Sequence, residues 1–188
     1  IRGNPNFAFY LLSMYLIVFG QMAVSFYIVY ARHAFGVSDG FAANLTFVAL
    51  VSQSISTPLL GAVGDRMGHK FLAELSCLFG MAALALMLFI PSVNWIYLVF
   101  LLLNLGMSGL KISRGAITME FSTEGQMPTF VALSGTLLGI PTFIAPIVGG
   151  GVLDAFGYAP LFATALVFSI VGVLVLKYKV NDPRVRRR

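Results

Sequence analysis

Charged residues are scarce in this sequence: they make up 10% of its 188 residues, whereas 59% are hydrophobic and the mean hydropathy is +0.91. Such a chain has too little polar surface to cover a soluble core, so we expect it to lie in a lipid bilayer. Its single cysteine, Cys77, excludes an internal disulfide and a cysteine metal cluster. Because the sequence has two histidines, no phosphate-binding loop and no catalytic triad, we expect no enzymatic role, no metal and no cofactor.

Apolar stretches dominate what is present. A helix needs about 20 apolar residues to cross a bilayer, and short polar loops divide this sequence into six such stretches. The predicted fold is therefore an all-α membrane protein, a single bundle of six transmembrane helices. The predicted spans cover residues 7–30, 41–63, 71–90, 95–114, 129–151 and 159–176.

Basic residues are distributed unevenly between the loops. Eleven of the twelve lysines and arginines fall on the side that both termini share, and Arg32 alone falls on the other. By the positive-inside rule both termini are cytoplasmic, which an even number of spans requires, and we expect a protein of the plasma (inner) membrane. The net charge of +5 does not indicate nucleic-acid binding, because the basic residues cluster at loop ends and the tail rather than along a face with stacking aromatics.

The loop between the second and third spans carries a motif of glycines and charges, namely Gly61, Asp65, Arg66, Gly68 and Lys70. Gly68 can take the positive φ that a tight reversal requires, and the charges of Asp65 and Arg66 can latch neighbouring helix ends. Five of the six fixed positions of G-x-x-x-D-R-x-G-R-R/K are matched, with His69 where an Arg is usual. The chain therefore resembles the major facilitator superfamily of membrane transporters, and the resemblance implies that this loop is a cytoplasmic gate.

The same resemblance implies that this chain covers about half of the family fold, because that fold has twelve spans built as two six-helix halves. Asn104 stands in the fourth span where the family's amino-terminal half usually has an Arg, and the basic tail after Asp182 resembles the close of such a transporter. We therefore expect the carboxyl-terminal half. Its partner would be a second six-helix half, in the same longer chain or supplied by homodimerisation.

An internal repeat is indicated by two similar turns. Gly61, Asp65 and Gly68 follow the second span, and Gly150, Asp154 and Gly157 follow the fifth at an offset of 89 residues. Two three-helix units that follow one another in this way must be inverted relative to each other, because each has an odd number of spans. Coincidence between two glycine-rich turns is the alternative interpretation.

The fifth span combines small residues with prolines. Small residues four apart let helices pack closely in lipid, and prolines bend a helix where neighbours satisfy the freed carbonyls. The stretch resembles the family's fifth-span motif, with Ala145 in place of a glycine, and it predicts helix packing and a kink. The residues concerned are Gly135, Gly139, Pro141, Pro146, Gly149 and Gly150.

Candidate cavity residues follow from the family's arrangement, in which the first and fourth helices of each half line the central cavity. The first span offers Gln21 and Ser25 and the fourth offers Asn104 and Ser108, each pair four residues apart on one helical face. Amides both donate and accept hydrogen bonds, so they suit a neutral or zwitterionic small solute. The alternative role is hydrogen bonding between helices.

Four charged residues are candidates for coupling or gating. Glu74 could carry a coupling proton, although an ion pair with Lys70 or Arg66 is the simpler interpretation. Lys111 and Arg114 share a face near the cytoplasmic end of the fourth span, from which they could reach the interface. They could instead pair with Glu120 or Asp65 as part of an inner gate.

These expectations combine into one functional hypothesis. The chain is expected to be a membrane secondary transporter, or half of one, that moves a small solute by alternating access. Solute movement could be coupled to an ion or a proton. A solitary half that does not transport and instead acts as a membrane scaffold or partner subunit is the competing hypothesis.

Overall fold

The computed structural model describes residues 5–122 and 125–182, and in this part of the chain all regular structure is helical. Six helical stretches are long and apolar enough to cross a membrane, which confirms the all-α fold class. The first stretch joins α1, η1 and α2, and the others are α3 to α7. The bounds are α1 Pro5–Gly20, η1 Gln21–Phe26, α2 Tyr27–Phe35, α3 Asp39–Met67, α4 His69–Leu88, α5 Trp95–Phe121, α6 Met127–Phe156 and α7 Tyr158–Lys179.

Two of these stretches differ from the predicted spans in a way that matters for the site. The first contains a 3₁₀ segment, η1, at its middle, where Gly149 of α6 packs so closely that a Cβ would lie 2.8 Å from the Met22 carbonyl oxygen. The fourth was expected to end at Arg114, but α5 continues for seven more residues to Phe121. Lys111 and Arg114 therefore lie well inside a membrane-spanning helix.

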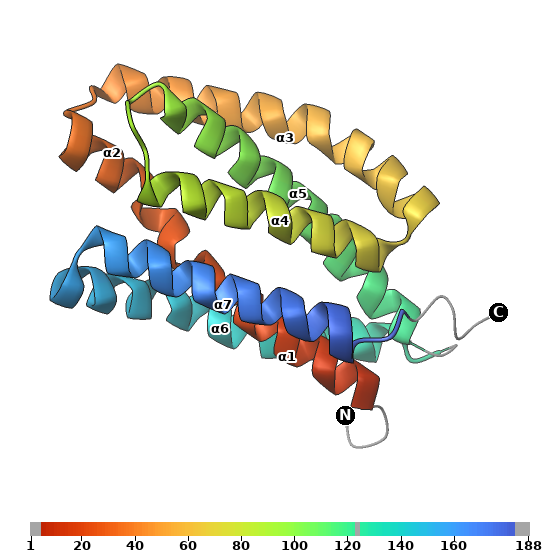
Figure 1. Ribbon diagram of the computed structural model, residues 1–188. Coiled ribbons are helices and arrows are strands. Elements are labelled where there is room, and N and C mark those ends of the chain that lie inside the picture. The colour runs from red at the N-terminus through yellow and green to blue at the C-terminus, as the bar shows by residue number, and fades with distance from the viewer. Residues whose placement is uncertain (1–4, 123–124, 183–188) are drawn as a thin grey trace.

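The helices form two groups of three (Figure 1). In one group α1 packs along α7 and against α6, and in the other α5 packs along α4 and against α3. Contacts between α4 and α7 join the groups. The apolar core has two parts, a cluster around Tyr27 and Phe162 and a cluster around Tyr10 and Leu176.

Close helix packing depends on small residues at both main contacts. A Cβ at Gly106 of α5 would lie 2.7 Å from the Ser76 carbonyl oxygen of α4, and a Cβ at Gly172 of α7 would lie 3.1 Å from the Ser13 carbonyl oxygen of α1. Backbones that approach this closely gain van der Waals contact, which replaces the hydrophobic effect as the attraction between helices in lipid.

Glycine turns join consecutive helices at opposite ends of the bundle. Gly68 has φ +101° and separates α3 from α4, and Gly157 has φ +84° and separates α6 from α7. Each glycine N–H donates to a carbonyl four residues earlier, at 2.9 Å and 2.8 Å. The positive φ expected at Gly68 is confirmed, and only glycine adopts it without strain.

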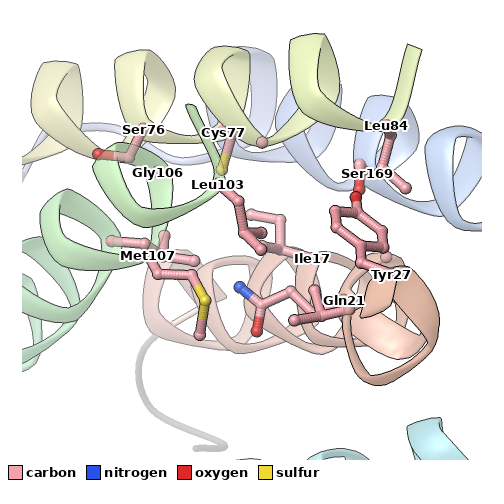
Figure 2. A pocket seen from close by; sticks show the side chains of 14 residues that line it. Ile17, Gln21, Tyr27, Ser76, Cys77, Leu84, Leu103, Gly106, Met107 and Ser169 are labelled. Carbon is pink, nitrogen blue, oxygen red and sulfur yellow. The ribbon is translucent and has the colours of Figure 1, made fainter. Parts of the chain in front are cut away.

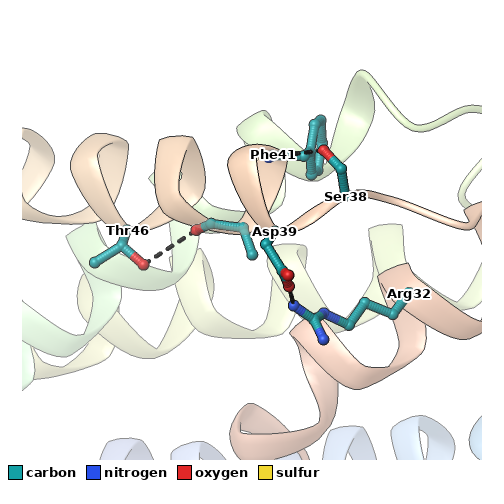
Figure 3. Close-up of polar contacts among 6 residues, drawn as sticks. Arg32, Ser38, Asp39, Phe41 and Thr46 are labelled. Carbon is teal, nitrogen blue, oxygen red and sulfur yellow. Dashed lines mark hydrogen bonds and ion pairs between the residues drawn. The ribbon is translucent and has the colours of Figure 1, made fainter.

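The start of α1 and the end of α7 lie at the same end of the bundle as the Gly68 turn (Figure 1). The start of α1 is tied there to the segment after α7, because the Asn6 side chain donates to the Asn181 carbonyl and accepts from the Asn181 N–H, at 2.8 Å and 2.7 Å. At the opposite end Arg32 pairs with Asp39, and Ser38 caps α3 by accepting from the Phe41 N–H (Figure 3).

Candidate functional site

Polar side chains meet in a cleft where α1 and η1, α3 and α5 face one another. One part of this cleft has a volume of about 320 Å³ and is lined by Gln21, Gln53, Met107, Leu110, Lys111 and Arg114. A second part of about 400 Å³ is lined by Gln53, Ser54, Thr57, Ser108, Lys111 and Ile112. Gln53 and Lys111 line both parts, so the two parts adjoin each other at these side chains. We refer to them together as the central cleft.

The polar groups of the central cleft lie near the middle of the membrane-spanning stretches. Gln21 and Gln53 are each within one residue of the midpoint of their transmembrane stretches, Pro5–Phe35 and Asp39–Met67. Lys111 is three residues past the midpoint of α5, or about 5 Å along its axis at 1.5 Å per residue. Polar groups at this depth are costly unless they face protein or water, which the cleft allows.

Hydroxyl groups on α3 donate hydrogen bonds to the backbone of their own helix. The Gln53 carbonyl accepts from the Thr57 hydroxyl at 2.7 Å and from the Ser56 hydroxyl at 3.3 Å. The Gln53 side chain belongs to an exposed residue, so its amide is available to a ligand in the cleft. On α5, by contrast, Ser108 is 3% exposed and its hydroxyl has no hydrogen-bond partner among the described residues.

A smaller cavity of about 40 Å³ lies behind the central cleft, between α1 with η1, α4, α5 and α7. Figure 2 shows Gln21, Tyr27 and Ser169 among the side chains around it. This volume is far below the 300 Å³ or more that is typical of small-molecule pockets. Gln21 lines both spaces, so its amide forms part of the wall between the helix-bundle interior and the cleft.

The structure divides the four predicted cavity residues into two pairs. Gln21 and Ser108 line the central cleft, as described above. Ser25 lies on η1 at the surface and does not line either part, and the Asn104 amide donates to the Phe100 carbonyl of its own helix at 2.7 Å. Gln53, for which the sequence indicates a packing role on the second span, is exposed and also lines the cleft.

The loop motif makes a different set of contacts from the Asp65–Arg66 latch expected for it. The Asp65 carboxylate lies 3.9 Å from His69 Nε2, and the His69 side chain is 10% exposed. Lys70 Nζ donates to the Lys177 carbonyl at 3.1 Å, which joins the start of α4 to the end of α7. Among the residues that the structure describes, Arg66 forms no ion pair.

The candidate charges also have different surroundings. Glu74 lies 3.6 Å from Lys70 Nζ, the ion pair that the simpler interpretation predicts. Glu120 is half-buried in the last turn of α5. Within residues 5–122 and 125–182, neither Lys111 nor Arg114 forms an ion pair with a carboxylate, so the expected pairing with Glu120 or Asp65 is not observed.

The predicted packing glycines of α6 differ in how closely other helices approach them. Gly149 meets η1 closely, and Gly150 lies near the Phe26 ring. A Cβ at Gly135 or Gly139 would meet no atom within 4 Å, so these two glycines form no close helix contact within the described chain. Pro141 and Pro146 lie inside α6, which continues through both of them.

Gly135 instead lines a third space, of about 190 Å³, between α5 and α6. Thr118, Ser134 and Arg114 line it as well. Arg114 also lines the central cleft, so this space adjoins the cleft at the Arg114 side chain. In the described residues no group of histidine, cysteine or acidic side chains could hold a metal ion.

Comparison with known proteins identifies the fold. A family model described as Major Facilitator Superfamily matches residues 10–188, which is nearly the whole chain and includes all six membrane-spanning stretches in whole or in part. No curated protein sequence matches the chain. Members of the family are membrane transporters and not enzymes. A bundle of six apolar helices with this match shows that the chain belongs to the major facilitator superfamily and is an integral membrane protein.

Proposed function

We propose that the chain forms one wall of a solute pathway in a secondary transporter that works by alternating access. The observation that carries this proposal is the central cleft, in which Gln21, Gln53 and Lys111 occupy the middle of three membrane-spanning stretches. Transporters bind their solutes near the bilayer midplane, between structural repeats. A cleft at that depth with amide and hydroxyl groups suits the binding of a small solute.

The opposite wall would be a second six-helix half, in the same longer chain or in a second copy. In support, α3 lines the cleft, α6 lines the third space between α5 and α6, and these two helices are the least buried of the six membrane-spanning stretches. Large apolar side chains lie exposed on both, among them Phe47 and Ile55 on α3 and Phe143 and Ile147 on α6. Apolar faces on two helices beside a polar cleft suit a protein partner at the cleft rim. The departure at Asn104 favours the carboxyl-terminal half.

An inverted repeat accounts for the arrangement of the helices. The offset of 89 residues relates the end of α3 to the end of α6 and the start of α4 to the start of α7. It also relates two interhelical contacts, because Gly20 packs against Ala165 and Gly109 packs against Ser76. The Gly68 and Gly157 turns lie at opposite ends of the bundle, as inversion requires (Figure 1).

Membrane orientation follows from charge. The end of the bundle with the Gly68 turn carries Arg66, Lys70, Lys177 and Lys179, so this end would face the cytoplasm of a plasma (inner) membrane. The loop from Gly61 to Lys70 would then act as a cytoplasmic gate, since Lys70 bridges from α4 to α7. Glu74 remains a candidate for proton coupling in this scheme.

Neutralising the gate carboxylate tests this role. We expect Asp65→Asn to lower the initial uptake rate by up to about fivefold without loss of expression, because exposed ion pairs such as that between Asp65 and His69 contribute about 0.2–1 kcal/mol. The measurement is uptake into proteoliposomes. Asp154→Asn, the same change at the repeat-related turn on the other side, is the matched control. Equal effects of the two changes, or no effect of Asp65→Asn, would remove the gate from the proposal.

Transport itself is tested by a screen of solute uptake. The intact protein is reconstituted into vesicles and offered small anionic, cationic, zwitterionic and neutral solutes, with and without a pH gradient. We expect saturable uptake of one chemical class above the level of protein-free vesicles. If no solute accumulates or exchanges while the protein remains folded, the proposal of transport fails and the scaffold hypothesis replaces it.

A further inference from the structure

Lys111 and Arg114 raise the question of what balances two cations inside the membrane. A lysine or arginine in the middle of a transmembrane helix is costly unless it faces protein or water. Lys111 lies about 5 Å and Arg114 about 9 Å from the midpoint of α5, at 1.5 Å per residue. Both residues therefore lie in the interior of a membrane-spanning helix and not at its end. Neither cation has a carboxylate partner in the described residues.

The side chains around the two cations can donate hydrogen bonds and carry no negative charge. None of the residues that line the central cleft is acidic. Two amides, Gln21 and Gln53, can turn their NH₂ groups toward the cleft. Ammonium, guanidinium and amide groups together make a set of hydrogen-bond donors around a net charge of +2.

We propose that the central cleft binds an organic anion, with Lys111 and Arg114 holding its negative charge and Gln53 donating to its oxygens. This inference rests on the proposed transport function and names the class of its substrate. It also replaces the neutral or zwitterionic solute expected from the sequence. Arginine binds a carboxylate through two parallel hydrogen bonds and lysine acts as a point charge, so the pair can hold both ends of a small dianion.

The size of the cleft favours a solute over a side chain of the second half. Its two parts have volumes of about 320 Å³ and 400 Å³, and small-molecule sites span about 300–1,000 Å³. A single carboxylate side chain would leave most of that space to be filled by other groups. The two cations are also in different environments, since Arg114 is half-buried and Lys111 is exposed to the cleft.

Four-carbon probes of matched size test the proposal. Thermal unfolding of the purified intact protein is followed with succinate, putrescine or 1,4-butanediol, at equal ionic strength adjusted with sodium chloride, and phosphate and benzoate extend the anion set. We expect at least one anion to raise the unfolding temperature in a saturable way, and the cation and the neutral diol to have no such effect. Lys111→Gln should weaken the apparent affinity by about 10- to 100-fold, the range for hydrogen bonds to charged groups.

Lys179→Gln is the matched control, because Lys179 is an exposed cation at the end of α7 and lies outside the cleft. It should leave anion binding unchanged. The proposal is overturned if no anion stabilises the protein, if the diol stabilises it equally, or if Lys111→Gln binds anions normally. It is also overturned if Lys111→Gln lowers stability in the absence of anions, which would indicate a carboxylate of the second half as the partner.

The two proposals fail in different ways. If a neutral solute is taken up independently of Lys111, transport stands and the anion site is wrong. If an anion binds through Lys111 but no solute crosses the membrane, the anion site stands and transport is wrong. Uptake and binding are therefore measured on the same protein preparation.

Discussion

Alanine in place of Gly106 is expected to lower the unfolding temperature of the purified protein. The added Cβ would lie 2.7 Å from the Ser76 carbonyl oxygen and 3.1 Å from the Gly80 nitrogen, and both are backbone atoms that cannot move aside without shifting α4. Overpacking of this kind destabilises proteins by about 1–3 kcal/mol. Since α4 and α5 form one of the main contacts of the bundle, the loss affects the whole half.

Gly151→Ala gives the control with the opposite expected sign. A Cβ at Gly151 would meet no atom within 4 Å, and alanine is favoured over glycine in a helix interior by about 0.5–1 kcal/mol. This change should leave the unfolding temperature unchanged or raise it. If both variants unfold at the same temperature, the close approach of α4 and α5 is not as described.

Leucine in place of Gln53 should abolish most transport, whereas leucine in place of Asn104 should have little effect. Both residues are amides near the middle of a transmembrane helix, but Gln53 lines both parts of the central cleft and Asn104 donates to its own helix at Phe100. A hydrogen bond to a charged solute contributes about 1.5–3 kcal/mol, so Gln53→Leu should lower the transport efficiency by about 10- to 100-fold.

The comparison is made on initial uptake rates over a range of solute concentrations, after circular dichroism and gel filtration show that both variants are folded. A similar loss in the two variants, or a greater loss in Asn104→Leu, would favour the cavity that the sequence analysis expected over the cleft that the structure describes.

Much of the fold could be predicted because it depends on composition and spacing. Six apolar stretches and the positive φ at Gly68 follow from the physics of the bilayer and of glycine. Helix ends were harder, since charge was taken as a sign of the interface. The fourth span was expected to end at Arg114, but α5 continues to Phe121, and the Lys111 and Arg114 side chains line the cleft.

The site could be predicted only in part, because a four-residue spacing places residues on one face without showing what that face meets. Gln21 and Asn104 are both amides on apolar spans, yet only Gln21 lines the cleft. Because α3 packs against α5, the opposite wall is formed by Gln53 of α3 and not by Asn104. Gly135 and Gly139 likewise have the spacing of a packing motif but lie on an open face of α6. Packing between distant segments decides these outcomes.

The central claim is that the cleft is reached from each side of the membrane in turn. The most direct measurement replaces Ser54, which lines the cleft, by cysteine in a Cys77→Ser background and follows its reaction with a membrane-impermeant maleimide. In oriented vesicles of the intact protein, we expect labelling from both sides, with the two rates changing in opposite directions when the transported solute is added. Labelling from one side alone under all conditions would contradict the account.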